Sequence, residues 1–481
     1  MVNEVGFVRT VKNFLLYLDG LPSIKVNDLV ENENGLRGWV NSLLPDTVEV
    51  LLLDEGGVRP GELFKRSGLK LTVPVGNFLL GRAINPLGIP IDGNGYLAKS
   101  AATVYAELDQ PAPGIGARKF INEQFITGIT LIDSLIPIGK GQRELILGDP
   151  RSGKTDSLID IILNQKNTKA ICIYASIGKP ITEVRAVIDA LRVNNSLSYT
   201  VVVAASSSDP APLIYLTPQT AFTIAEYFQK QGKDVLVILD DLGNHAKIYR
   251  EIALLGDSSV GRESYPGDIF YQHGHLLERA GNFKPEAGGG SITALPAIEL
   301  NLNDFTTLIP TNVMSMTDGH ILFKSALYNK GQRPAIDLSL SVSRVGHQTQ
   351  TPMQSTTATL IKQTLAQAAE LETVSRFSFE LPLSTQITLK QRELIEEIIH
   401  QPILTYIPPD IQIILLALPF TKFLLSKNSQ FVKERKQAII SAFTSAPQLV
   451  QITHQIPKFT SLDQLTKALD QVHSQMEQII R

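Results

Sequence analysis

The sequence predicts three domains of different fold class: a small β-barrel at residues 1–74, an α/β domain with a parallel sheet at residues 75–350, and a helical domain at residues 351–481. Three observations indicate this division. The first segment holds short β-rich runs separated by turn signals. The second holds apolar, β-branched runs that alternate with helical stretches, and the third repeats apolar residues at helical spacing.

The first segment is typical of closely spaced short strands. Val48 to Leu53 forms one β-rich run, and turn signals occur at Asp19-Gly20, Asn34-Gly35 and Gly56-Gly57. Short strands connected in this way favour a small closed barrel over an open sheet.

The second segment contains the runs expected to form the parallel sheet. They are Leu145 to Leu147, Ala170 to Tyr174, Thr200 to Val203 and Val235 to Leu239. Continuous apolar strands with helices between them indicate a sheet covered on both faces.

Two apolar stripes predict amphipathic helices in the third segment. The stripes are Leu394, Ile395, Ile398 and Ile399, and then Leu462, Leu465, Leu469, Val472 and Met476. We interpret both as the core of a helical bundle rather than as a groove for a cofactor or partner.

Composition excludes several classes of function. The formal net charge is −3 with both signs interspersed, so no basic footprint for nucleic acid is expected. The single cysteine, Cys172, cannot form an internal disulfide. We predict neither a signal peptide nor a membrane span, since the most apolar run, Ile411 to Phe420, is too short to cross a bilayer. Any work at a membrane therefore requires docking to another protein.

One motif fits the pattern G-x-x-x-x-G-K-[ST] of a phosphate-binding loop. Its residues are Gly148, Asp149, Pro150, Arg151, Ser152, Gly153, Lys154 and Thr155. Because a strand precedes it and a helix follows it, a chance glycine-rich turn is disfavoured. Backbone N–H groups would cradle a polyphosphate, Lys154 would reach the β- and γ-phosphates, and Thr155 would ligate Mg²⁺. Pro150 has no N–H to offer, so the later loop residues supply most donors.

Two further positions bear on chemistry at this site. Asp240 follows a buried strand and suits the second Mg²⁺ position, directly or through a water. Hydrolysis also needs a group that activates the attacking water. Lys179 follows the strand at Ala170 to Tyr174 and cannot serve as a carboxylate base. The sequence is therefore better equipped to hold ATP or ADP than to hydrolyse it.

Several longer motifs carry a family resemblance. They are Gly141 to Asp149, Tyr265 to Tyr271, Gly288 to Ser291 with Thr293 to Pro296, Ile309 to Val313, and Ser341 to Gly346. In this order they resemble the α subunit of F-type ATP synthase over nearly the whole chain, more loosely in the C-terminal domain. The resemblance implies a RecA-like central domain and a hexameric ring in which α subunits alternate with catalytic β subunits around a γ shaft.

The resemblance also implies a function. α subunits keep Mg-ATP without turning it over, inside a complex that transports H⁺ or Na⁺. They have glutamine where β subunits have the catalytic glutamate, and Lys179 falls there in this chain. The implied location is peripheral, on the cytoplasmic or equivalent face of an energy-coupling membrane. Contacts with δ or the stator are expected, with the membrane reached only through the Fo sector and with no nucleic acid.

Particular residues match functional positions of the family. Arg344 matches the arginine finger that reaches a neighbouring β subunit's nucleotide, and Ser341 matches a position that orients the same segment. Tyr328 matches an aromatic ring near adenine, Arg333 matches a residue beside it, and Gln401 matches one of two glutamines near the purine.

The chain departs from the family pattern at other places. Ile403 stands where the second glutamine is expected, which would relax purine selectivity or weaken binding. Asp257 and Ser258 replace arginines in a segment that faces the shaft, and this leaves the γ contact open. The family's extra N-terminal segment, which docks the stator, is essentially missing from this sequence.

Two alternative functions share parts of this fold. A self-sufficient hexameric export-type ATPase would need its own catalytic base, and Lys179 counts against it. A Rho-type RNA helicase would need basic or aromatic loops that grip single strands, and the charge balance does not show them.

Overall fold

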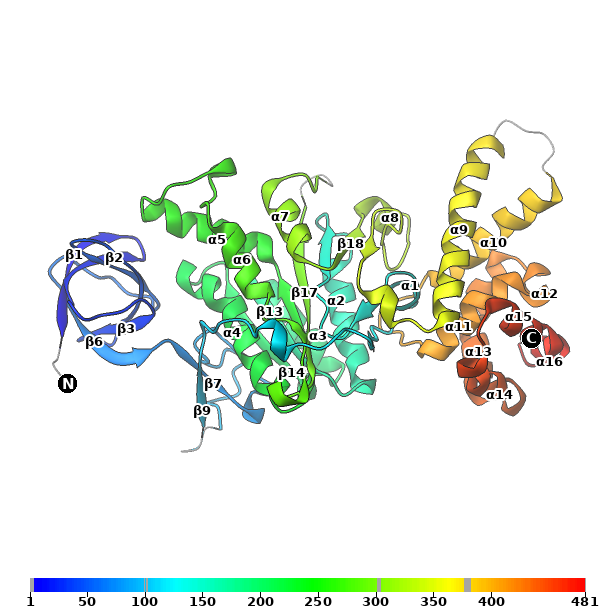
Figure 1. Ribbon diagram of the computed structural model, residues 1–481, viewed down its shortest axis with the longest axis horizontal. Coiled ribbons are helices and arrows are strands. Elements are labelled where there is room, and N and C mark those ends of the chain that lie inside the picture. The colour runs from blue at the N-terminus through cyan, green and yellow to red at the C-terminus, as the bar shows by residue number, and fades with distance from the viewer. Residues whose placement is uncertain (1–3, 99, 101–102, 301–303, 376–381, 481) are drawn as a thin grey trace. The chain divides into compact units, whose positions relative to one another are not determined.

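The computed structural model describes residues 4–98, 100, 103–300, 304–375 and 382–480 (Figure 1). The chain forms two compact units. The first consists of Met1–Phe120, Lys140–Pro150 and Gln165–His320, and the second consists of Ile121–Gly139, Arg151–Asn164 and Ile321–Arg481. All three predicted fold classes are present.

The first strands of the chain close into an antiparallel barrel, as the short β-rich runs predicted. They are β1 (Val5–Lys12), β2 (Leu15–Gly20), β3 (Asp28–Asn32), β4 (Arg37–Leu43), β5 (Val48–Leu52) and β6 (Leu63–Lys70), paired in the order β1-β2-β5-β4-β3-β6. Alternate side chains point inward. Leu16 and Leu18 of β2 meet Val48 and Val50 of β5 in the barrel core.

The parallel sheet of the first unit confirms the four predicted strands. In spatial order its strands are β12 (Leu145–Gly148), β17 (Ser291–Glu299), β15 (Asp234–Asp240), β13 (Ile171–Lys179), β14 (Thr200–Ser206) and β8 (Ala83–Ile84). Because they run parallel, their carboxyl ends share one edge of the sheet. The loops after Gly148 and Asp240 leave from that edge.

Helices and short strands complete the first unit. The helices are α3 (Ile181–Val193), α4 (Ala211–Gln229), α5 (Leu242–Leu255), α6 (Ile269–Leu277) and α7 (Leu308–Met316). The short strands β7 (Thr72–Val75) and β9 (Val104–Glu107) pair with each other, and β16 (Gly281–Asn282) pairs with β17. Helix α4 packs against β13, β14 and β15.

The second unit is mainly helical. Its helices are α1 (Thr130–Leu135), α2 (Lys154–Asn164), α8 (Ser325–Asn329), α9 (Pro352–Ser375), α10 (Leu383–Ile399), α11 (Pro409–Ala417), α12 (Lys422–Leu425), α13 (Ser429–Ser445), α14 (Pro447–Gln455), α15 (Leu462–Gln471) and α16 (His473–Ile479). It also contains the hairpin β10 (Gln124–Phe125) with β11 (Ile138–Gly139), and β19 (Val342–Ser343) beside β18 (Gly319–Phe323).

The two apolar stripes are buried in this unit except for Val472, which is half-buried, and one helix differs from expectation. Leu394, Ile395, Ile398 and Ile399 of α10 are all buried, which confirms the bundle core. The closing stripe belongs to two helices instead of one. At the end of helix α15 the Val472 N–H donates to the Leu469 carbonyl, an i→i−3 hydrogen bond of the 3₁₀ type. Helix α16 begins at the next residue.

Candidate nucleotide-binding site

A turn joins strand β12 to helix α2 and contains the predicted phosphate-loop residues. β12 ends at Gly148 in the first unit and α2 begins at Lys154 in the second, so the chain crosses from one unit to the other within this loop. Gly153 has a φ of +83°, a left-handed conformation that favours glycine. A Cβ atom there would lie 2.8 Å from the ring of Tyr328. Both the backbone and the neighbouring ring therefore require glycine.

The loop residues differ in exposure. Asp149 and Ser152 are buried, whereas Pro150 and Arg151 are exposed. The exposed pair includes the proline, which has no N–H to donate.

Lys154 and Thr155 open helix α2, which is anchored by its apolar face. Leu158 and Ile162 are fully buried within the second unit, Lys154 is buried and Thr155 is half-buried. A helix N-terminus presents backbone N–H groups that no helical carbonyl accepts, and these suit an anion. The hydroxyl of Thr155 is a hard oxygen in this first turn, and its chemistry fits a Mg²⁺ ligand.

Asp240 ends strand β15 in the first unit, and both oxygens of its carboxylate have partners. The Tyr174 hydroxyl donates to Oδ2 at 2.6 Å, and the Lys179 ammonium lies 3.2 Å from Oδ1. The Lys179 and Asp240 side chains are 13 % and 5 % exposed. Sequence reasoning treated these two residues separately and missed their ion pair. The available signal was their position on neighbouring parallel strands.

The electrostatics of this cluster keep Lys179 charged. Burial opposes its charge, but the carboxylates of Asp240 and Asp241 outweigh burial and raise the pKa of Lys179 above its ordinary value. Burial raises the pKa of Asp241, whose Oδ1 accepts a hydrogen bond from the Asn244 N–H at the start of α5. Burial, followed by the charge of Asp240, raises the pKa of Tyr174 well above its usual range, so its hydroxyl remains a donor.

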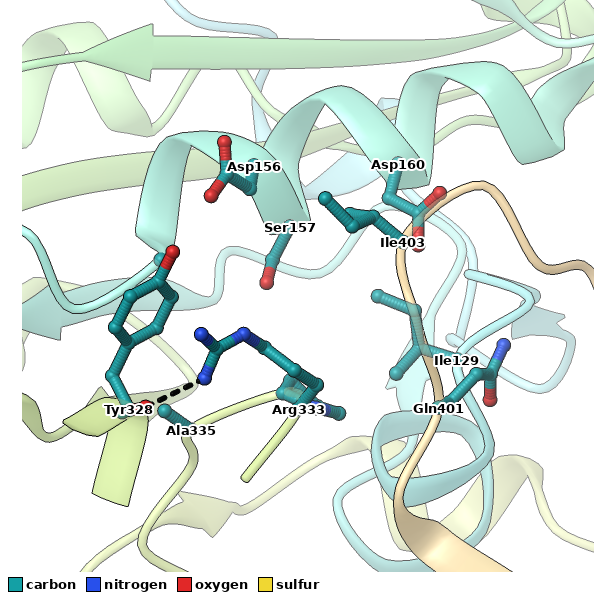
Figure 2. Close-up of a pocket in the computed structure, with 11 residues that line it drawn as sticks. Ile129, Asp156, Ser157, Asp160, Tyr328, Arg333, Ala335, Gln401 and Ile403 are labelled. Atoms are coloured by element: carbon teal, nitrogen blue, oxygen red, sulfur yellow. Dashed lines mark hydrogen bonds between the residues drawn. The ribbon is translucent and has the colours of Figure 1, made fainter. Parts of the chain in front are cut away.

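A second group of predicted residues lines a pocket of the second unit (Figure 2). Its lining residues are Ile129, Gly153, Asp156, Ser157, Asp160, Tyr328, Arg333, Pro334, Ala335, Gln401 and Ile403. The structure thus brings together Tyr328, Arg333 and Gln401 beside Gly153 of the phosphate loop. Asp160 is a buried acid that sequence reasoning missed. Its Oδ1 accepts the Leu404 N–H at 2.8 Å, and burial raises its pKa to about 6.

Arg333 and Tyr328 are tied to each other in this pocket. The Arg333 guanidinium lies over the Tyr328 ring, 3.4 Å from its centroid, and Nη1 donates to the Tyr328 carbonyl at 2.8 Å (Figure 2). A cation over an aromatic face is held by the ring's quadrupole. The flat, rigid pair suits stacking against a planar base.

Gln401 lies in the same pocket, but its amide is used by the chain itself. Oε1 accepts both the N–H and the hydroxyl of Thr130, and Nε2 donates to the carbonyls of Gly128 and Thr405. These bonds use both amide hydrogens and two acceptor positions. Gln401 therefore shapes the pocket wall. Ile403, by contrast, is 52 % exposed at the rim and brings no polar group.

Arg344 lies in a firmly held segment of the second unit. Its side chain is exposed and makes no hydrogen bond or ion pair with the described residues. Ser341 accepts the Leu322 N–H at 3.0 Å and donates to the Asp337 carbonyl at 2.6 Å. Ser343, which sequence reasoning missed, donates to the Pro137 carbonyl at 2.6 Å. The arginine is thus presented outward from an anchored strand.

No helix among the described residues combines the length and the apolar character needed to span a membrane.

Comparison with known proteins adds a family to this geometry. Residues 128–343 match the ATP synthase alpha/beta family, nucleotide-binding domain, and residues 350–476 match the ATP synthase alpha/beta chain, C terminal domain. The ATP synthase subunit alpha of Mycoplasma genitalium and that of Mycoplasma pneumoniae are each 45% identical over 401 residues, which cover 83% of this chain and 77% of the relative. The ATP synthase subunit alpha of Metamycoplasma arthritidis is 40% identical over 478 residues, 99% of this chain and 88% of the relative.

Proposed function

This chain belongs to the ATP synthase alpha/beta family as a relative of its α subunits, and we propose that it is the non-catalytic, regulatory nucleotide-binding subunit of an F1 sector. In this role it holds ATP or ADP without turning it over. It also lends Arg344 to the site of a neighbouring catalytic subunit.

The observation that carries the non-catalytic assignment is the ion pair between Lys179 and Asp240. Phosphoryl transfer to water needs a group that orients and activates the nucleophile. At the position where a carboxylate base is expected, this chain has a buried ammonium held by a carboxylate. A protonated lysine accepts no proton, so Lys179 cannot act as the base for hydrolysis.

The role of Arg344 is supported by its exposure and its anchoring. A guanidinium that neutralises charge on a transferring phosphoryl group accelerates reactions by about 10³- to 10⁵-fold where such fingers act. Arg344 is exposed with its guanidinium unpaired in the described chain, and Ser341 and Ser343 hold the backbone directly before it. A finger needs this combination of a fixed backbone and a guanidinium open to a partner.

The nucleotide would lie with its phosphates on the loop and its base in the pocket. We assign phosphate contacts to the loop backbone and to Lys154, and a Mg²⁺ position to Thr155. When bound, Mg²⁺ neutralises phosphate charge. We assign the base to the stacked pair of Tyr328 and Arg333. The domain boundaries at residues 74 and 350 stay predictions.

The proposed partners follow from the family. We infer an alternating ring with β subunits around γ, with δ or stator contacts, attached to a membrane only through the ion-transporting sector. The complex as a whole is an H⁺- or Na⁺-transporting ATPase. The self-sufficient export-type ATPase is not favoured, because the relatives described above are named ATP synthase subunit alpha.

Steady-state ATPase activity tests the proposal. The purified chain should bind ATP but barely turn it over. The complex reconstituted with β and γ subunits should hydrolyse ATP. Arg344→Ala should lower its turnover rate by about 10³-fold or more. Arg435→Ala, at an exposed position of α13, is the matched control and should change little. Brisk hydrolysis by the chain alone would overturn the non-catalytic assignment.

A further inference from the structure

Asp160 of helix α2 is a buried acid that lines the base pocket, and all the residues that line this pocket belong to the second unit. We infer that Asp160 selects the base by accepting hydrogen bonds from its N–H groups, so that the site takes guanine nucleotides at least as well as adenine nucleotides. This inference rests on the proposed nucleotide site and names the base that the site accepts.

The carboxylate of Asp160 is fixed at one oxygen and free at the other. Oδ1 accepts the Leu404 N–H at 2.8 Å, whereas Oδ2 makes no hydrogen bond or ion pair with the described residues. The residue is only 4 % exposed, and Figure 2 shows its carboxylate beside Ile403 at the edge of the cavity. A buried carboxylate oxygen usually has a hydrogen-bond donor. A ligand in the pocket would supply this donor.

The other polar atoms available to a base are mainly donors. The Gln401 amide is used by the chain itself, and Ile403 brings no polar group. Nη1 of Arg333 donates to backbone carbonyls, but its Nε and Nη2 make no hydrogen bond with the described residues, and neither does the Ser157 hydroxyl. The pocket therefore offers one carboxylate acceptor on α2, a hydroxyl on the same helix, and guanidinium donors.

This set of groups matches the edge of guanine better than that of adenine. Burial raises the pKa of Asp160 to about 6, so above neutral pH the carboxylate is ionised and can only accept. Guanine places two donors side by side, at N1 and at its 2-amino group, and has acceptors at O6 and N7 that suit arginine. Adenine has one amino donor, and its N1 is an acceptor that a carboxylate repels.

A purely structural role of Asp160 is the alternative to be separated. Leu404 has a φ of +64°, and the bond from its N–H to Asp160 holds this turn of the chain. Asp160→Asn keeps an oxygen for the Leu404 N–H but places an amide N–H₂ where Oδ2 lies. The variant therefore preserves the structural bond and replaces an acceptor by a donor at the base.

The test measures the dissociation constants of the full-length chain for GTP, ITP and ATP by calorimetry, at about pH 8 where Asp160 is ionised. GTP and ITP differ only in the 2-amino group. In the natural chain GTP should bind at least as tightly as ATP. It should bind about tenfold more tightly than ITP, the range of one hydrogen bond to a charged group. In Asp160→Asn the advantage of GTP over ITP should disappear.

Asp463→Asn is the matched control, because it removes the same charge at an exposed position of α15 in the same unit, outside the lining of the pocket. Its GTP-to-ITP ratio should equal that of the natural chain. ATP binding more than about threefold tighter than GTP, or equal binding of GTP and ITP, in the natural chain would overturn the inference and leave the proposed function intact. A GTP-to-ITP ratio unchanged in Asp160→Asn would assign Asp160 a structural role only.

Two further outcomes are also decisive. Absence of binding of all three nucleotides to the natural chain would overturn the nucleotide site and this inference with it. If Asp160→Asn fails to fold, the GTP-to-ITP and GTP-to-ATP ratios of the natural chain decide by themselves.

Discussion

The side-chain oxygen of Gln401 accepts two hydrogen bonds from Thr130, one from the backbone N–H and one from the hydroxyl, each 2.9 Å long. The amide nitrogen of Gln401 donates to the Gly128 and Thr405 carbonyls. One buried side chain thus joins the turn before α1 to the segment after α10. We expect its main contribution to be to the stability of the second unit.

Replacing Gln401 by alanine should therefore lower the free energy of unfolding by about 3 kcal/mol, since several buried polar groups lose their partners. Ile403→Ala, two residues away and half-exposed, should cost no more than about 0.5 kcal/mol. Urea unfolding followed by far-UV circular dichroism measures both. Equal effects of the two variants would show that the Gln401 bonds do not stabilise the unit.

Ile403 provides the corresponding test of base selectivity. It stands at the rim of the base pocket in place of a glutamine and can neither donate nor accept a hydrogen bond. Ile403→Gln should raise the preference for ATP over GTP by about two- to tenfold, the range of one net hydrogen bond. Competition binding of the two nucleotides measures the ratio. Ile403→Leu keeps the apolar character and should leave the ratio as it is.

Stability should fall as the pH falls, because of a buried histidine of the first unit. Burial lowers the pKa of His245 to about 4, and its ring nitrogens contact His273 and the Tyr215 carbonyl. The His245 ring is protonated near pH 6.5 in the unfolded chain, but only near pH 4 in the folded chain. The contribution of His245 to the free energy of unfolding is therefore complete above about pH 6.5. It decreases by about 3 kcal/mol as the pH falls from about 6.5 to about 4.

Urea unfolding between pH 7 and pH 4 tests this histidine prediction. His245→Gln removes the titrating ring, so its unfolding free energy should vary less across the same window. His347→Gln, at an exposed position, serves as the control. A natural chain and a His245→Gln variant with the same pH profile would contradict the assignment.

Local patterns predicted most of the fold. Apolar runs marked the parallel strands because those strands are buried on both faces, and the observed strands extend past the predicted ends by a few small or polar residues. β13 runs on to Lys179 through Ser176 and Gly178, since β14 and β15 pair with it on either side. Composition alone assigns such polar residues to a loop. The phosphate loop was predictable because its residues are consecutive.

The contacts that give the site its character join residues distant in sequence. Thr130 and Gln401 are 271 positions apart, and Tyr174 and Asp240 are 66 apart. No spacing rule connects such pairs, so the Gln401 network and the Lys179 ion pair appeared only with the structure. The resemblance indicated which residues line the base pocket but not which of their polar atoms the chain already uses.

The backbone that carries Arg344 leads to a last prediction. Gly346 lies against the Pro137 carbonyl, where a Cβ atom would stand 1.6 Å from the oxygen, and its N–H donates to Ser343. Gly346→Ala must therefore displace the segment around Arg344. Misplacing a catalytic group by about 1 Å can cost about 10²-fold in rate. The ATPase rate of the reconstituted complex should therefore fall by about 10²-fold. The affinity of the chain alone for ATP should be unchanged. Gly57→Ala, which has open space around it, should leave both intact. Full activity in Gly346→Ala would show that the finger tolerates movement of its backbone.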